Sequence, residues 1–143
     1  MTLRSIILFL TFYSLIISLK SCRTSTNKSF IVRKLDKTIK PIRISISDLA
    51  ENYKKFQGQY IETTGTFQHG FEEFAIYPDT TLFTGPSKGF WLDINRDLNL
   101  DRSYFEKIDG KRVRIKGIID TTSKGHMGSY WATIDKIYFW EEQ

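Results

Sequence analysis

The stretch "YKKFQGQYIETTGTF", residues 53–67, has a divergent second copy 52 residues later in "FEKIDGKRVRIKGII", residues 105–119. Gly58 and Gly110 hold the same place in the two copies. Glycine adopts the left-handed backbone conformation that ends a helix at little cost, so each copy reads as a helix end, a glycine and a strand. The repeat therefore predicts two similar helix-to-strand units in one domain.

The strand part of each copy alternates between two faces, as a half-buried strand does. The residues on the more apolar face are Ile61, Thr63, Gly65 and Phe67 in the first copy and Val113, Ile115, Gly117 and Ile119 in the second. A glycine inside a strand indicates a bulge or a bend, so we expect bends at Gly65 and Gly117. The helix of the first unit is expected to begin at Ser47 or Asp48, because both side chains are good N-caps.

Three further strands are expected at Glu72–Pro78, Gly89–Ile94 and Ser129–Trp140. The eleven Phe and seven Tyr also favour β-structure. Five strands with glycine-rich turns and one or two short helices predict a mainly β protein, a five-stranded OB-like Greek-key barrel. A small β-sandwich is the alternative.

The N-terminus has the pattern of a targeting segment. Arg4 precedes the mostly apolar run Ile6–Leu19, which spans fourteen residues without a charge. A membrane-spanning helix needs about 20 apolar residues, whereas the core of a signal peptide needs about 7–15. Residues 1–21 are therefore predicted to be a signal peptide.

The only cysteine, Cys22, ends the string "LKSC". This string resembles the lipobox of bacterial lipoproteins. Leu19 and Ser21 match the pattern, and Lys20 departs from it because a small uncharged residue is usual there. The resemblance implies cleavage before Cys22 and acylation with fatty acids such as palmitate, hence a membrane-anchored lipoprotein of the bacterial cell envelope that faces the periplasm or the exterior. An ordinary secretory signal is the alternative.

Charge divides the rest of the chain into two parts. Between Cys22 and Arg43 seven Lys/Arg face one Asp, whereas from Ile44 onward twelve Lys/Arg face fifteen Asp/Glu. Residues 22–43 are therefore predicted to be a basic membrane-proximal tether, and residues 44–143 the OB-like domain. A nucleic-acid-binding domain usually carries a basic excess on its folded body, so nucleic acid is not an expected partner.

Five stretches of the body together carry a resemblance. They are "ISDLAENYKKFQGQYIETTG", "GFEEFAIY", "FWLDI", "DGKRVRIKGIID" and "GHMGSYWATIDKI". Residues 46–137 thus resemble a family of small uncharacterised bacterial lipoproteins with an OB-like domain, and the GHMG string is the most specific part. The chain departs from the family form at Glu73–Phe74, where a glycine is common. The resemblance implies a fold and a location more than an activity.

The string "KGHMGSYW" holds the first candidate site. Gly125 and Gly128 permit a tight turn around His126. In the favoured interpretation the imidazole donates a hydrogen bond to a backbone carbonyl and locks the loop. In the alternative, His126 contacts a ligand together with Tyr130 and Trp131.

His69 and Trp91 complete the set of candidate ligand-binding residues. His69 is expected in the turn between the first two strands, and in an OB-fold this turn and the loop of His126 flank one binding face. Two histidines with Glu72 or Glu73 could form a metal or acid–base site. No sequence motif supports such a site, so no metal, cofactor or catalytic residue is predicted.

The loop "DINRDLNLD", residues 93–101, alternates Asp and Asn as a calcium loop does, but Leu98 and Tyr104 stand where an EF-hand needs glycine and glutamate. A solvated loop is the interpretation. The sequence as a whole predicts a lipid-anchored, non-enzymatic binding or accessory module of unknown ligand, with an envelope protein or glycan as partner. The alternatives are a small envelope enzyme or metal-binding protein that uses His126 and His69 with a carboxylate, and a structural envelope-assembly subunit.

Overall fold

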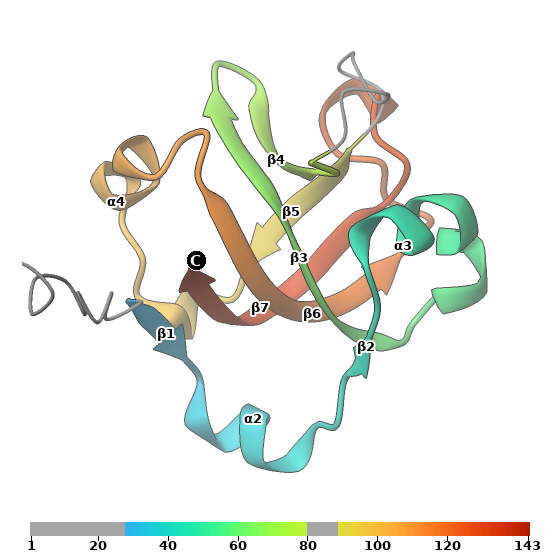
Figure 1. Ribbon diagram of the computed structural model, residues 1–143, viewed down its shortest axis with the longest axis horizontal. Helices are drawn as coiled ribbons and strands as arrows, with labels where there is room; N and C mark the ends of the chain where they lie inside the picture. The colour runs from blue at the N-terminus through green and yellow to red at the C-terminus, as the bar shows by residue number, and fades with distance from the viewer. Residues whose placement is uncertain (1–27, 80–88) are drawn as a thin grey trace, which may run out of the picture.

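The computed structural model describes residues 28–79 and 89–143. The expected signal peptide and Cys22 lie outside these residues. Five strands form a closed barrel (Figure 1): β3 (Tyr60–Gly70), β4 (Glu73–Tyr77), β5 (Phe90–Ile94), β6 (Arg112–Asp120) and β7 (Thr133–Glu142). Around the barrel the order is β3-β4-β5-β7-β6 and back to β3, with only the β5–β7 pairing parallel among these neighbours. The predicted mainly β, OB-like Greek-key barrel is confirmed.

The two copies of the repeat pair with each other. Strands β3 and β6 are antiparallel, with Thr63 opposite Ile115 at the centre and each mid-strand glycine opposite a β-branched residue of the other copy, in the pairs Ile61–Gly117 and Val113–Gly65. The flanking hydrogen bonds are equivalent too. The N–H of Gly58 donates to Ile119 and that of Gly110 to Phe67, over 2.8 Å and 2.9 Å. The two copies of the repeat are therefore related by a local pseudo-twofold axis that passes through the β3–β6 ladder.

The short helices begin and end where local chemistry allows. Helix α3 (Ile46–Asn52) runs into the 3₁₀ helix η1 (Tyr53–Phe56), and α4 (Arg102–Lys107) precedes the second copy of the strand. The glycine after each helix has the expected positive φ, 73° at Gly58 and 72° at Gly110. The N-cap of α3 is Ser45, whose Oγ accepts from the N–H of Asp48 at 3.1 Å, and not Ser47 or Asp48 as expected.

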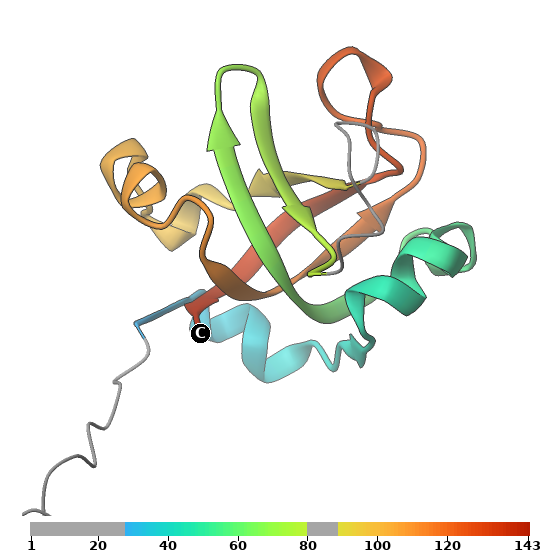
Figure 2. The same cartoon turned by 45° about the horizontal axis from the view of Figure 1, so that its top comes forward.

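Residues 29–43, expected to be a tether, pack against the barrel. Strand β1 (Ser29–Ile31) pairs with β7, helix α2 (Arg33–Thr38) follows, and β2 (Ile42–Arg43) pairs with β3. Figure 2 shows this segment running beneath the barrel. The basic charge of the segment suggested a solvated tether, but apolar side chains in it pack against the folded domain. Phe30 packs edge-on against Tyr104 with ring centroids 4.8 Å apart.

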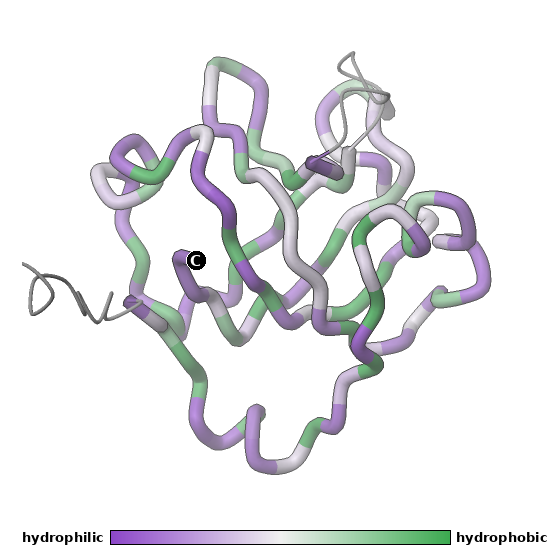
Figure 3. The backbone as a smooth tube through the Cα atoms, viewed as in Figure 1, coloured by the Kyte–Doolittle hydropathy of each residue, from purple (hydrophilic) through white to green (hydrophobic). Residues whose placement is uncertain are grey.

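The core fills the barrel with large aromatic and β-branched side chains. Trp140, Phe67 and Phe90 are fully buried in this core, and Phe67 meets Trp140 edge-on at 5.1 Å between ring centroids. Figure 3 shows polar and apolar residues alternating along the barrel strands, as a core on one face requires.

Two glycines allow strands to come close together. A Cβ added at Gly65 would lie 2.5 Å from the carbonyl oxygen of Tyr77 and 2.7 Å from Cδ1 of Ile46. Gly117 lies at a register shift between β6 and β7, which confirms the expected irregularity there, whereas Gly65 keeps its register with β6. Among the residues that the structure describes, no helix has both the length and the apolar composition to cross a membrane.

These glycines give a stability prediction. Gly65→Ala should lower the free energy of unfolding by about 3 kcal/mol, because the new methyl group overlaps backbone. Gly58→Ala meets nothing within 4 Å and suffers only from its positive φ, so it should cost about 1 kcal/mol. Chemical denaturation of the two variants measures both values. Equal losses would show that close packing at Gly65 is not the constraint.

Candidate functional site

Two loops meet at one end of the barrel. The turn between β3 and β4 consists of residues 71 and 72, and the loop between β6 and β7 carries the 3₁₀ helix η3 (His126–Gly128). Both project from the same end (Figure 2) and enclose a pocket of about 280 Å³. We call it the loop-tip site; its lining residues are Phe71, Glu72, Glu73, His126, Met127, Ser129 and Tyr130.

The backbone at both loop tips adopts conformations that L-residues seldom occupy. Glu72 has φ 61° and Met127 has φ 51°, although neither is glycine. Such residues cost free energy and tend to occur at functional sites, where the surrounding structure holds them. The GHMG turn is held by its own hydrogen bonds, including Ser129 N–H to the carbonyl of His126 at 3.1 Å and Gly128 N–H to that of Gly125 at 3.3 Å.

Trp91 supports the GHMG turn from below. A Cβ added at Gly125 would lie 2.5 Å from Cβ and Cγ of Trp91, so only glycine fits between the turn and the indole. The indole also meets the ring of Tyr130, with centroids 5.2 Å apart. Trp91 was a candidate ligand-binding residue; the structure places it beneath the turn, where it positions the loop.

Two buried tyrosines, Tyr77 and Tyr130, belong to one small cluster, and Tyr130 also lines the site. The hydroxyl of Tyr77 donates to Oε1 of Glu73 at 2.7 Å. Burial is the main cause that raises the pKa of Tyr77 far above its usual value, and it also raises the pKa of Tyr130. The hydrogen bond from the Tyr77 hydroxyl keeps the carboxylate of Glu73 in place.

His126 contacts a carboxylate across the two loops. Its Nε2 lies 3.3 Å from Oε2 of Glu72, while 39% of the His126 side chain and 51% of the Glu72 side chain remain exposed. This nitrogen is itself buried and makes no hydrogen bond within the described structure. The group that faces this nitrogen is thus the Glu72 carboxylate and not the backbone carbonyl that was expected.

The other histidine lies elsewhere. His69 on β3 stacks on Phe105 with centroids 6.5 Å apart and meets Phe74 edge-on at 5.9 Å. It does not line the loop-tip site, so the expected combination of His69 with His126 and a carboxylate is not assembled there. Across the described residues, no cluster of three or more His, Cys, Asp or Glu is placed to hold a metal ion.

The remaining candidates have packing or capping surroundings. Trp131 is half-buried against Phe90, with ring centroids 5.3 Å apart. In the Asp93–Asp101 loop, Asn95 accepts from the N–H of Asp97 at 3.0 Å, and Asp101 accepts from that of Tyr104 at 2.8 Å. These oxygens cap the helices η2 (Arg96–Leu98) and α4, and the bond from Tyr104 is the main cause that lowers the pKa of Asp101.

Sequence reasoning missed Phe71 and Met127, the two most exposed large apolar side chains among the residues that the structure describes. Phe71 is 94% exposed and Met127 is 86% exposed, one on each loop of the site. Phe71 directly follows Gly70, the glycine that ends β3. A bulky apolar residue in a two-residue turn was the signal that could have indicated an exposed apolar side chain here.

No protein-family model matches the sequence, and a comparison with curated proteins gives no significant match.

The site predicts how stability responds to two substitutions. His126→Ala should change the free energy of unfolding by less than about 1 kcal/mol, because the pair with Glu72 is partly exposed. Tyr130→Ala should cost about 3 kcal/mol, because it removes a buried aromatic side chain. Thermal melts of both variants test this. A loss at His126 as large as that at Tyr130 would make the imidazole a structural lock.

Proposed function

We propose that this protein is a binding module whose partner docks on the loop-tip site. The observation that carries the proposal is the pair Phe71 and Met127, two large apolar side chains almost fully exposed on adjacent loops. Covering such apolar side chains with a partner is favourable, and aromatic residues and Met are enriched at protein interfaces.

The surroundings of the two anchors indicate the chemistry of the partner. Glu72 and Glu73 place two carboxylates beside them. A protein surface with an apolar side chain next to a Lys or Arg would complement this arrangement in both burial and charge. The unbranched thioether side chain of Met127 can adapt to the shape of the partner's apolar group. The backbone of both turns is already fixed in one conformation, which reduces the entropy cost of docking.

We also propose that the module is a lipid-anchored protein of the bacterial cell envelope. The support is the sequence: a signal-peptide pattern, the LKSC string and the resemblance to small lipoproteins. Six residues separate Cys22 from the first residue of β1. An extended chain covers at most about 3.6 Å per residue, so anchoring at Cys22 would keep the barrel within roughly 25 Å of the membrane.

The docking proposal is tested with the double variant Phe71→Ser/Met127→Ser. Both side chains are exposed, so the melting temperature should stay the same while affinity for the partner falls at least roughly tenfold. The measurement is cross-linking in envelope extract followed by a binding titration of the partner so identified. Raising the ionic strength should also weaken binding of the partner, because salt screens the attraction between its basic side chain and the carboxylates of Glu72 and Glu73.

Ile42→Ser provides the matched control. Ile42 is an exposed apolar residue on β2 that does not line the site, so its loss should leave binding unchanged. Equal losses for the control and the double variant would contradict the loop-tip site. Retention of a glycan instead of a protein would contradict the proposed partner.

The anchoring proposal is tested with Cys22→Ser. Without the thiol no acyl chain can be attached, so the variant should leave the membrane fraction or accumulate as an unprocessed precursor. Membrane fractionation together with the gel mobility of the chain gives the readout. A variant processed and fractionated like the wild type would exclude the lipid anchor.

A further inference from the structure

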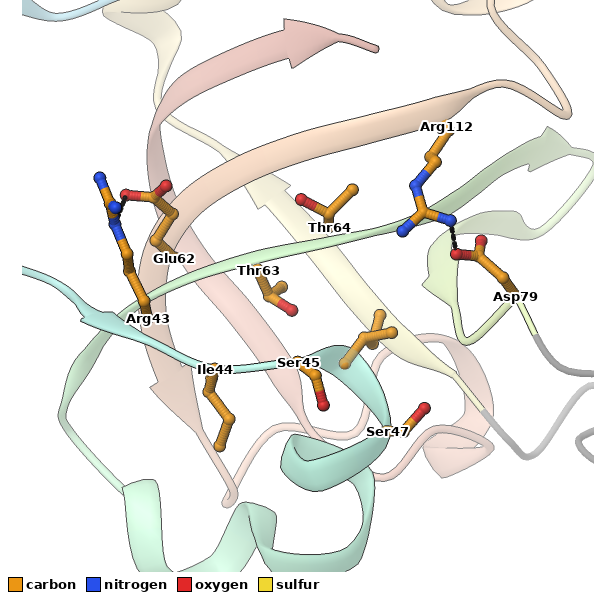
Figure 4. A pocket seen from close by; sticks show the side chains of 10 residues that line it. Arg43, Ile44, Ser45, Ser47, Glu62, Thr63, Thr64, Asp79 and Arg112 are labelled. Atoms are coloured by element: carbon orange, nitrogen blue, oxygen red, sulfur yellow. Dashed lines mark hydrogen bonds and ion pairs between the residues drawn. The ribbon is translucent and has the colours of Figure 1, made fainter.

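A second, larger pocket lies where β3 changes partners. The pairing of β2 with β3 ends at Glu62, and that of β4 with β3 begins at Thr66. Between them, residues 63–65 of β3 keep β6 as their only strand neighbour within the described structure. The resulting pocket has a volume of about 510 Å³, within the range of small-molecule sites (Figure 4). We call it the strand-gap pocket.

A buried hydroxyl in this pocket lacks a partner. Thr63 is only 2% exposed, and within the described structure its Oγ1 makes no hydrogen bond. Figure 4 shows Thr63 between β3 and Ser45, among the side chains that line the pocket. A buried polar atom without a partner costs free energy, so most such atoms are paired with protein or with a bound molecule. Thr63 therefore offers a position for a ligand hydroxyl.

The charges of the pocket are already compensated. Arg43 and Arg112 lie at its opposite ends (Figure 4). Nε of Arg43 is 3.5 Å from Oε2 of Glu62, and Arg112 forms an ion pair with Asp79. An anion or a cation would have to compete with one of these pairs. A neutral ligand can instead add hydrogen bonds to both ends without separating them.

We propose that the strand-gap pocket binds a neutral, hydroxyl-rich ligand the size of one or two sugar rings. Hydroxyls of the ligand would meet Thr63, Thr64 and Ser47, and its C–H faces would lie on Ile44 and Ile46. Each ligand hydroxyl both donates and accepts, which suits a lining of side-chain hydroxyls and ion pairs. This site is separate from the loop-tip site and does not depend on the proposed protein partner.

The test is a titration of the full chain, held in a detergent without a sugar headgroup, and followed by amide NMR shifts. Glucose, maltose and N-acetylglucosamine serve as neutral probes, with inorganic phosphate and methylammonium as charged ones. At least one sugar should shift the amides of residues 43–47 and 62–64. Thr63→Val keeps the shape but removes the hydroxyl, so it should weaken binding of that sugar roughly tenfold without lowering the melting temperature.

Thr133→Val is the matched control. Thr133 is also buried, but its Oγ1 lies 2.8 Å from Oγ of Ser123 and thus has a partner. This variant should lower the melting temperature by about 4 °C and leave sugar binding unchanged. The proposal is overturned by the absence of any sugar-induced shift, by tighter binding of a charged probe, or by shifts confined to residues 71–73 and 126–130. Destabilisation by Thr63→Val equal to that of the control would also overturn it, because the hydroxyl would then have a structural partner.

Discussion

The antiparallel pairing of β3 with β6 is the constraint on which the rest of the structure depends. This ladder closes the barrel, and each of its mid-strand glycines faces a β-branched residue of the other copy. A side chain at Gly65 would collide with the carbonyl of Tyr77, so the close approach of β4 to β3 requires glycine there. On β3, the pairing with β2 ends at Glu62 and the pairing with β4 begins at Thr66. The strand-gap pocket lies between these two pairings.

The loop-tip site follows from the way the β6–β7 loop returns to the barrel. The N–H of Trp131 donates to Gly89 and that of Trp91 donates to Ala132, each at 3.1 Å, so the end of the loop is fixed along β5. Trp91 of β5 pairs with Ala75 of β4, so the end of the β6–β7 loop also lies close to β4, the strand that follows the turn at Glu72. The contact between the two loops is thus a consequence of strand order.

Much of this arrangement could be predicted from local pattern. The repeat gave the two glycine-ended helices and the β3–β6 strands, because positive φ and alternation are properties of a short stretch. The features that were missed depend on distant residues. Phe30 packs on Tyr104 and so brings a basic segment into the fold, and Glu72 meets His126 across two loops. Two further features also depend on how the strands pack together. They are the close contact of Gly125 with Trp91 and the lack of a hydrogen-bond partner for the Thr63 hydroxyl within the described structure.

The layer beneath the two loops is packed separately from the barrel interior. Ala75, Tyr77 and Tyr130 form a small buried cluster apart from the main core, with Trp91 packed against it. The hydroxyl of Tyr77 in this cluster donates to Glu73 and so connects the layer to the carboxylates above it. Substitutions at the exposed tips, Phe71 and Met127, are therefore expected to leave the β3–β6 ladder intact, which is the arrangement that the proposed recognition surface requires of its scaffold.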